Sequence, residues 1–166
     1  MPKFELPPGN YGNNPWLGSS SPERQGAWGD LEYHRIYNGG VGLPKFQYAS
    51  GAITWNKRVS GVYANRIVNR YGGYTSDTLE VDNPDSTETI EGVTVTHVAV
   101  KYPHTYSIDG DSGGPWWIGA SGGAAAVGIH MGSTWISFPD CCHRAVVTPA
   151  TNLDNIWPSA TCYTSP

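Results

Sequence analysis

The segment with the clearest chemical content is residues 110–115, which read GDSGGP. A serine acts as a nucleophile when its hydroxyl is exposed on a sharp turn that also directs backbone N–H groups toward one point. Glycines permit such a turn, and the directed N–H groups can stabilise the oxyanion of a tetrahedral intermediate. The segment therefore predicts a nucleophilic Ser112, against the simpler interpretation of a glycine-rich β-turn with an incidental Asp–Ser pair.

Short alternating stretches predict the strands that would position this turn. They lie at residues 30–37, 52–55, 58–63, 66–69, 78–81, 91–101, 116–118, 124–131 and 134–138. Turn residues at 71–73 (YGG) and 82–85 (DNPD) are predicted to separate some of them. Many short strands at this spacing indicate an all-β sandwich or barrel. Residues 148–157 predict one short terminal helix, which Pro158 would end.

The composition agrees with a β-rich domain. The 166 residues include 21 Gly and 13 Pro, and only 14% are charged, against roughly 25% in an average globular protein. This excludes a coiled coil, a helical bundle and a disordered tail. The net charge of −4 gives no reason to expect a nucleic acid partner, and no apolar run is long enough to cross a membrane. We expect a secreted, extracellular domain.

At residues 110–115 the sequence resembles the chymotrypsin-like serine peptidases, in which GDSGGP surrounds the nucleophile, and especially their compact bacterial secreted, streptogrisin-like branch. Residues 68–76 are similar to a strand and turn early in that branch's second barrel, and residues 126–133 to the strand that lines its specificity pocket. The resemblance covers about residues 30–157.

The resemblance implies an all-β fold of two antiparallel six-stranded β-barrels of the trypsin-like type, with a short C-terminal helix. The first barrel would be incomplete. Residues 1–45 are then expected to be the remnant of the first barrel and the interbarrel segment. Residues 46–166 are expected to form the second barrel, with the nucleophile, the helix and the tail.

The resemblance also implies roles for individual residues in a serine endopeptidase. Ser112 would be the nucleophile, and the backbone N–H groups of Gly110 and Ser112 would form the oxyanion hole. Asp111 would be a buried carboxylate that braces the turn, and Asp30 would orient the catalytic base. The simpler interpretation of Asp30 is a turn residue that starts a strand. We expect a polypeptide substrate, no cofactor, no metal ion and a monomer.

The catalytic histidine is not where the resemblance requires it. In that family the order along the chain is His, Asp, Ser. Five histidines are present, and all of them follow Asp30: His34, His97, His104, His130 and His143. We therefore expect that the first part of the peptidase domain, with the histidine, is missing from this chain, which alone would be weakly active or inactive. The alternative is a peptidase-like pseudoenzyme that keeps the cleft as a binding surface.

Three residues are expected at the pocket for the side chain that precedes the cleaved bond: Ser107, His130 and Ser133. Tyr106 stands where an Asp would select Lys or Arg. The Gly-Ile-His pattern that ends at His130 resembles the glutamate-specific bacterial members, in which this histidine and nearby hydroxyls hold the substrate carboxylate. The alternative is a wall histidine bonded to the backbone, and Asp109 would oppose an anionic substrate.

The three cysteines are Cys141, Cys142 and Cys162. Neighbouring cysteines rarely bridge each other, so one of the first two is predicted to pair with Cys162, leaving one thiol. A zinc site made of these cysteines and His143 is the poorer alternative, because adjacent ligands point apart and no C-x₂-C spacing is present.

A different class of function would use tryptophans as platforms for carbohydrate in a β-sandwich. The candidates are Trp16, Trp28, Trp55 and Trp135. Burial in a core is the commoner fate of such residues. This alternative also leaves the GDSGGP segment without a role.

Overall fold

The computed structural model describes residues 24–26, 28–31, 45–48, 51–90, 92–101, 107–136 and 142–156. The strands are β1 (Arg24–Gly26), β2 (Gly29–Leu31), β3 (Lys45–Tyr48), β4 (Gly51–Arg58), β5 (Ile67–Tyr71), β6 (Ser76–Glu80), β7 (Asn83–Ile90), β8 (Val93–Lys101), β9 (Pro115–Ala120), β10 (Gly123–Ile136) and β11 (Cys142–Pro149). A 3₁₀ turn, η2 (Ala150–Asn152), leads into the short helix α1 (Leu153–Ile156). The all-β class with a short C-terminal helix is thus confirmed.

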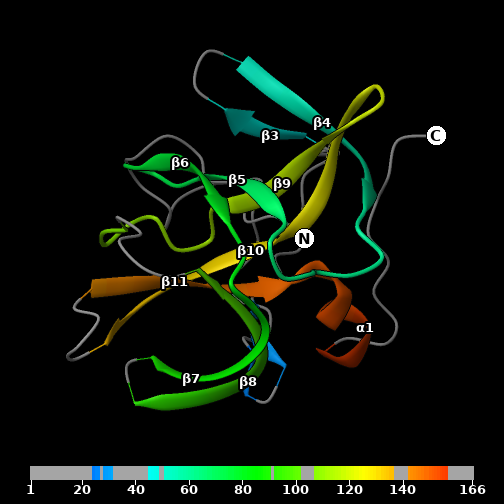
Figure 1. Ribbon diagram of the computed structural model, residues 1–166. Helices are drawn as coiled ribbons and strands as arrows, with labels where there is room; N and C mark the ends of the chain where they lie inside the picture. Colours follow the sequence, from blue (N-terminus) through cyan, green and yellow to red (C-terminus); the bar gives the residue numbers. More distant parts are fainter. Residues whose placement is uncertain are drawn as a thin grey trace, which may run out of the picture.

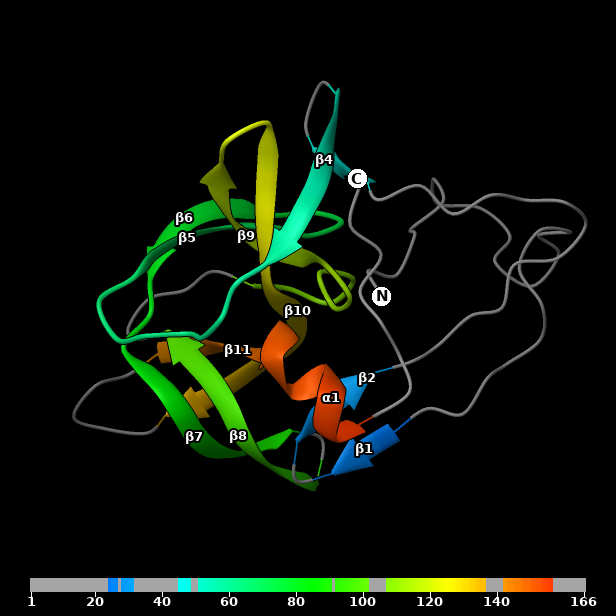
Figure 2. The same cartoon turned by 90° about the vertical axis from the view of Figure 1, so that its right-hand side faces the viewer.

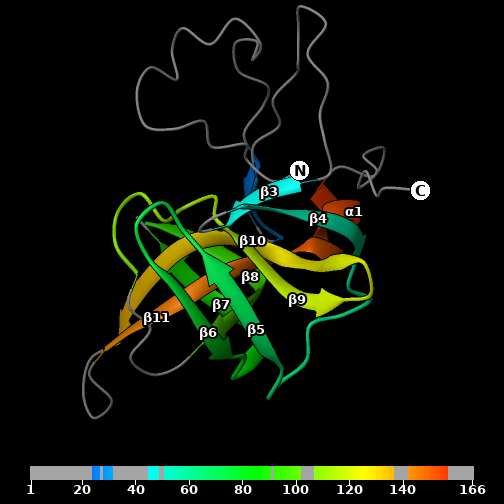
Figure 3. The same cartoon turned by 90° about the horizontal axis from the view of Figure 1, so that it is seen from above.

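One strongly curled sheet carries most of the strands, in the order β6-β5-β9-β10-β11-β8-β7 with antiparallel neighbours (Figure 1). Seen from above, β5 and β6 cross β8 and β11 steeply (Figure 3). Strands β5, β6, β9, β10 and β11 all contribute to one buried cluster, so the sheet wraps around it. Its members are Val59, Val68, Leu79, Val81, Trp116, Ala125, Val127, Ala145 and Val147.

Strand β9 lies between two cores because successive side chains of a strand point to opposite faces. Trp116 is fully buried in the inner cluster, whereas Trp117 packs outside the sheet with Phe46 and Trp55. The ring centroid of Phe46 lies 4.5 Å from that of Trp55 and 4.8 Å from that of Trp117. The β3–β4 hairpin therefore covers the outer face of β9, and β4 also pairs in parallel with β10. Trp55 is buried here, as the core-packing interpretation predicts, and is not available as a platform for carbohydrate.

A separate hairpin, β1–β2, packs against β8, with β2 also touching β10 and β11 (Figure 2). Gly29 lies against Thr148 of β11, and the side-chain amide of Asn152 donates to the carbonyl of Trp28 at 2.8 Å. The backbone of Asp30 pairs with that of Gln25 in this hairpin, while the side chain of Asp30 lies outside the described part of the chain. The candidate orienting carboxylate thus belongs to a strand that packs beside β10.

A largely buried ionic network joins β7, β10 and β11. The carboxylate of Glu88 accepts from Arg144 Nη2 at 2.6 Å and from the hydroxyl of Ser86 at 2.5 Å. Arg144 Nε donates to the hydroxyl of Thr134 at 2.8 Å, and that hydroxyl lies 3.4 Å from Glu88 Oε2. The network connects the edge strand β7 to the far half of β10.

Two predicted features differ from the structure near the edges of the sheet. The strand predicted over residues 58–63 is wrong beyond Arg58, where β4 ends. The buried Val59 makes the last backbone bond to β10, from its N–H to the carbonyl of Ala126 at 2.9 Å. The turn predicted at residues 82–85 is instead the start of β7. Pro84 is accommodated because β7 is an edge strand whose pairing is irregular between Asn83 and Ser86.

The region after the nucleophile also differs. The stretches predicted at residues 124–131 and 134–138 belong to one strand, β10, which ends at Ile136 in the described chain and has register shifts along its length. Strand β11 was not predicted, and it includes Thr148 and Pro149, which were assigned to the helix. The turn η2 and helix α1 follow it, and Pro158 lies outside the described residues.

Candidate active site

The GDSGGP turn is fixed against β10 by backbone hydrogen bonds. The N–H of Gly113 donates to the carbonyl of His130, and the N–H of His130 donates to the carbonyl of Gly114, both at 2.8 Å. Within the turn, Asp111 donates to the carbonyl of Ile108 and Gly114 to that of Asp111, both at 3.1 Å. Gly110 has a φ of +95°, a conformation that side-chain-bearing residues rarely adopt. Glycine thus permits the backbone conformation of the turn, and the hydrogen bonds to β10 fix it.

Ser112 stands exposed at the tip of this turn. Its hydroxyl donates to the backbone carbonyl of Met131 at 3.0 Å. The N–H groups of Asp111, Gly113 and Gly114 all have backbone acceptors. In contrast, the N–H groups of Gly110 and Ser112 have no acceptor among the described residues. Two backbone N–H groups of the turn are therefore left without an acceptor among the described residues, and backbone donors of this kind can bind an oxyanion.

The carboxylate of Asp111, which is fully buried, supports the turn from below. Its Oδ1 accepts from the N–H groups of Tyr74 and Thr75 at 2.9 Å each, and its Oδ2 accepts from the N–H of Ile108 at 3.2 Å and from the Thr75 hydroxyl. Burial by itself would raise the pKa of Asp111, but these hydrogen bonds outweigh it and hold the pKa below its usual value. The expected role of Asp111 as a buried support of the turn fits this geometry.

Arg70 shares this buried centre, and the sequence interpretation did not identify it. It is 1% exposed; its Nη1 lies 3.4 Å from Asp111 Oδ2 and its Nε donates to Asp77 at 2.9 Å. Its Nη2 donates to the hydroxyl of Thr75 at 2.7 Å. Arg70 follows Val68 on the inward face of β5. An arginine at a core position of an alternating strand is the sequence signal that could have indicated a buried ionic contact. A side chain at Gly72 would collide with the Asp111 carboxylate, which explains the glycine there.

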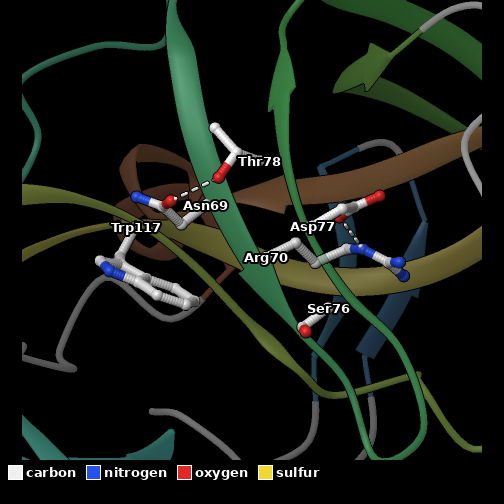
Figure 4. Close-up of a pocket in the computed structure, with 6 residues that line it drawn as sticks. All are labelled: Asn69, Arg70, Ser76, Asp77, Thr78 and Trp117. Carbon is white, nitrogen blue, oxygen red and sulfur yellow. Dashed lines mark hydrogen bonds and ion pairs between the residues drawn. The ribbon is translucent and has the colours of Figure 1, made fainter. Parts of the chain in front are cut away.

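A hollow of about 160 Å³ lies along β5 and β6, where Figure 4 shows Asp77 beside Arg70. It is lined by Asn69, Arg70, Ser76, Asp77, Thr78 and Trp117. Its polar side chains bond one another: Thr78 donates to Asn69 at 2.9 Å, and Arg70 to Asp77. Of the residues that line the hollow, Arg70 connects it to the buried Asp111.

The structure brings together two of the three expected pocket residues. Ser107 Oγ lies 2.7 Å from His130 Nε2, and Ser107 is partly exposed whereas His130 is 1% exposed. His130 stacks near Trp116, with ring centroids 6.1 Å apart. Burial, reinforced by the positive charge of Arg70 and opposed by Asp111, lowers the pKa of His130 to about 3. The imidazole is therefore neutral near pH 7, and its Nε2 partner is a hydroxyl instead of the backbone.

Ser133 lies further along β10, beyond the register shift between His130 and Gly132, and is partly exposed. Tyr106, His34, His104, Cys141 and Cys162 lie outside the described residues. His97 is described as part of β8, and Cys142 and His143 as part of β11, without their side chains.

Among the described residues, no imidazole accepts the hydroxyl of Ser112. That same part of the chain contains no group of three or more His, Cys, Asp or Glu that could hold a metal ion. It also contains no helix long and apolar enough to cross a membrane.

Comparison with known proteins identifies the fold. No protein-family model and no curated protein sequence matches this sequence. A glutamic-acid-specific serine protease that uses a histidine triad in substrate binding superposes with a TM-score of 0.64 at 20% identity, covering 81% of this chain and 70% of the protease. Thermobifida fusca protease A superposes with a TM-score of 0.62 at 22% identity, over 78% of this chain and 66% of that one.

A Nocardiopsis protease gives a TM-score of 0.63 at 17% identity and covers 85% of this chain and 78% of its own. These proteins and this chain share one overall arrangement of strands. The chain therefore has the fold of the bacterial chymotrypsin-like serine proteases.

Proposed function

We propose that the protein is a serine endopeptidase that cleaves polypeptides through an acyl-enzyme at Ser112. The observation that carries this proposal is the hydrogen-bond pattern of the turn, in which only the N–H groups of Gly110 and Ser112 lack acceptors among the described residues. These two donors would bind the oxyanion that forms when Ser112 Oγ attacks the peptide carbonyl. The shared fold supports the same reaction class.

The proton acceptor for Ser112 completes the proposal. A histidine oriented by Asp30 would take the proton of Ser112 and later deliver it to the leaving amine. Because no histidine precedes Asp30, we infer that the 166-residue chain alone lacks this base. Loss of the base lowers kcat by something on the order of 10⁶. The chain would then be weakly active or inactive by itself. The contact of β2, which contains Asp30, with β10 supports the proposal that Asp30 belongs to the same site as the turn on β10.

An activity-based probe tests both statements. A peptidyl phosphonate reacts covalently only with a serine whose proton is removed by a base, so we expect it to label the complete product of the gene at Ser112. The 166-residue chain is expected to stay unlabelled, and Ser112→Ala is the control for site specificity. Strong labelling of the 166-residue chain at Ser112 contradicts the missing base. A complete product without labelling contradicts the peptidase and leaves the pseudoenzyme.

The pocket favours an acidic side chain before the cleaved bond. The partly exposed hydroxyl of Ser107 can donate to a substrate carboxylate while it remains within reach of His130 behind it. An anion bound there would raise the pKa of His130 and so favour the imidazolium as a counter-charge. A structural neighbour is itself specific for glutamic acid. Asp109 is exposed and lies outside this hydrogen-bonded pair.

Matched substrates test this preference. Peptides that differ only in Glu or Gln before the cleaved bond are expected to differ by at least tenfold in kcat/KM with the complete product, because each charge-assisted hydrogen bond contributes about 1.5–3 kcal/mol. Ser107→Ala should reduce the ratio of kcat/KM for the Glu peptide to that for the Gln peptide. The same ratio measured with Ser133→Ala gives the contribution of the Ser133 hydroxyl. Equal cleavage after aromatic, basic and glutamyl residues would contradict the proposal.

The remaining features of the proposal rest on the composition, the cysteine positions and the family resemblance. We propose an extracellular monomer that acts on polypeptides, with residues 1–45 from the first barrel and interbarrel segment and residues 46–166 as the second barrel. The disulfide between Cys162 and one of Cys141 and Cys142 belongs to the same proposal.

A further inference from the structure

The orientation of one peptide group decides whether the turn offers both candidate oxyanion donors. The N–H of Asp111 donates to the carbonyl of Ile108 at 3.1 Å, so residues 108–111 form a β-turn with Asp109 and Gly110 at its centre. The N–H of Gly110 belongs to the peptide group between these two central residues and has no acceptor among the described residues. Within that part of the chain, no hydrogen bond from this N–H fixes its direction.

Two common types of β-turn differ by a rotation of the central peptide group. In a type II turn the third residue has a φ of about +80°, whereas in the commoner type I turn it has a φ of about −90°. Gly110 has a φ of +95°, as in a type II turn, and glycine adopts either sign of φ with similar ease. Rotation to the type I form would reverse the N–H of Gly110. A contact from outside the turn can therefore decide between the two orientations.

The ring of Tyr74 lies where it distinguishes these orientations. A Cβ at Gly110 would overlap Cε2 of this ring and lie 2.9 Å from its Cδ2, so the ring edge packs on that side of the glycine. At a φ of +95° the carbonyl of Asp109 nearly eclipses the Cβ position of Gly110, and the N–H points to the opposite side. The ring edge of Tyr74 therefore lies on the side of the carbonyl and away from the N–H.

The charge distribution of the ring favours the observed orientation. The edge of an aromatic ring is positive, so it attracts a carbonyl oxygen and repels an N–H. In the type I form the N–H of Gly110 would point toward the ring edge instead. The backbone of Tyr74 is itself held in place, because its N–H donates to Asp111 Oδ1 at 2.9 Å. The carboxylate that supports the turn thus also places the ring beside it.

We propose that Tyr74 is a positioning residue for the oxyanion site: its ring holds the peptide group between Asp109 and Gly110 so that the N–H of Gly110 stays available to an oxyanion. This inference rests on the proposed peptidase function, because the direction of this N–H matters for catalysis only if Ser112 attacks a carbonyl. The contact with Gly110 is made by ring carbons, so the ring and not the hydroxyl of Tyr74 is the group to test.

NMR of the ¹⁵N-labelled 166-residue chain tests the orientation without catalysis. In a type II turn the Hα of the second residue lies close to the amide proton of the third, and the nuclear Overhauser effect between them is stronger than in a type I turn. We expect a strong effect between Asp109 and Gly110 in the unmodified chain. Tyr74→Ala should weaken it and add microsecond-to-millisecond exchange at the Gly110 amide, which relaxation dispersion measures. Tyr74→Phe should match the unmodified chain.

Kinetics of the complete product of the gene test the consequence for catalysis. Tyr74→Ala is expected to lower kcat by about three- to tenfold with KM unchanged, because the N–H of Gly110 is needed only in the transition state. Tyr74→Phe should keep kcat. Tyr63→Ala is the matched control, since Tyr63 is 57% exposed and packs on another glycine, Gly61, in the connection between β4 and β5. This control should change neither the turn nor kcat.

Three results would overturn the positioning role. The first is a turn in Tyr74→Ala with the same strong Overhauser effect and no added exchange. The second is a kcat that does not fall in this variant. The third is a rise in KM with kcat unchanged, which would place the ring in contact with substrate.

The phosphonate experiment separates failure of the positioning role from failure of the peptidase. A complete product labelled at Ser112, together with any of these three results, overturns the positioning role alone. A complete product without labelling overturns the peptidase, and exchange in the Tyr74→Ala chain then still supports the ring as the group that orients the N–H of Gly110. With neither labelling nor exchange, both are overturned.

Discussion

At the scale of single residues, Asp111 determines the shape of the site. Its carboxylate joins the β5–β6 connection, the segment before the nucleophile and the buried Arg70. None of these contacts involves Ser112 itself. The turn that exposes Ser112, the candidate nucleophile, therefore depends on a carboxylate that is itself fully buried.

Replacement of Asp111 should unfold the turn and destabilise the protein. Asp111→Ala removes the carboxylate that accepts from three backbone N–H groups, one hydroxyl and the Arg70 guanidinium, and we expect the free energy of unfolding to fall by about 3 kcal/mol or more. Urea unfolding at pH 7 measures this. Asp109→Ala, an exposed carboxylate two residues away, is the matched control and should change stability by less than about 0.5 kcal/mol. Equal effects of the two would show that Asp111 does not support the turn.

His130 gives the protein a pH dependence of defined sign. Its pKa is about 3 in the folded state, against an ordinary value of 6.5, so the unfolded state binds more protons between these values. The free energy of unfolding should therefore fall as pH drops below 6.5, at up to about 1.4 kcal/mol per pH unit. Asp111 adds a second loss only below its ordinary pKa, as pH falls through its lowered value.

Urea unfolding at pH 7 and pH 5 measures the contribution of His130, with His130→Gln as the reference that cannot titrate. We expect the unmodified protein to lose about 2 kcal/mol more than the variant between these pH values. The same loss in both proteins would assign the pH dependence to other groups.

At the scale of elements, the network of Glu88, Thr134 and Arg144 holds three strands together. Arg144→Met leaves the buried Glu88 carboxylate without its cation, so we expect a loss of about 3–5 kcal/mol. The double variant Glu88→Leu, Arg144→Met removes both charges and should be more stable than Arg144→Met alone. A double-mutant cycle in urea tests this, and additive losses would contradict a coupled pair.

The strands show how far a sequence alone can predict the elements. Alternation correctly indicated β4, β5, β8 and β9, because each presents one regular face to a core. Alternation failed for two strands, β7 and β11, whose sequences do not alternate for different reasons. Pro84 in β7 indicated a turn, because proline has no N–H to donate to a neighbouring strand. An edge strand with irregular pairing tolerates a residue that lacks this donor. Strand β11 reads as a continuous apolar stretch around residues 145–147 and has no alternation to detect, since both of its faces are buried.

The site divides in the same way. The glycine-rich turn around Ser112 could be predicted, because the conformation of a turn depends mainly on consecutive residues. The pair of Ser107 and His130 was expected from a resemblance, and the hydrogen bond between them required the fold. Arg70 and Tyr74 were not identified, because their importance comes from contacts with residues about forty positions away along the chain.

At the scale of the whole molecule, the three buried apolar clusters of the described chain all lie after residue 44. A chain that begins at residue 45 keeps the inner core, the outer core of Phe46, Trp55 and Trp117, and the candidate nucleophile. It loses the packing of the β1–β2 hairpin on β8, β10 and β11. We expect this shorter chain to unfold cooperatively in urea at a lower midpoint than the 166-residue chain. Tryptophan fluorescence measures the transition, and a transition without cooperativity would place the domain boundary elsewhere.

The two adjacent tryptophans of β9 limit how the gene can change in length. Trp116 and Trp117 belong to different cores, and Ser112 precedes them by only a few residues. One inserted codon between Ser112 and Trp116 would either exchange the two indoles between the cores or displace the nucleophile from its turn. The exposed turn at Ser121 and Gly122 faces no such constraint. Natural insertions and deletions in related genes should therefore accumulate after β9 and be excluded before it.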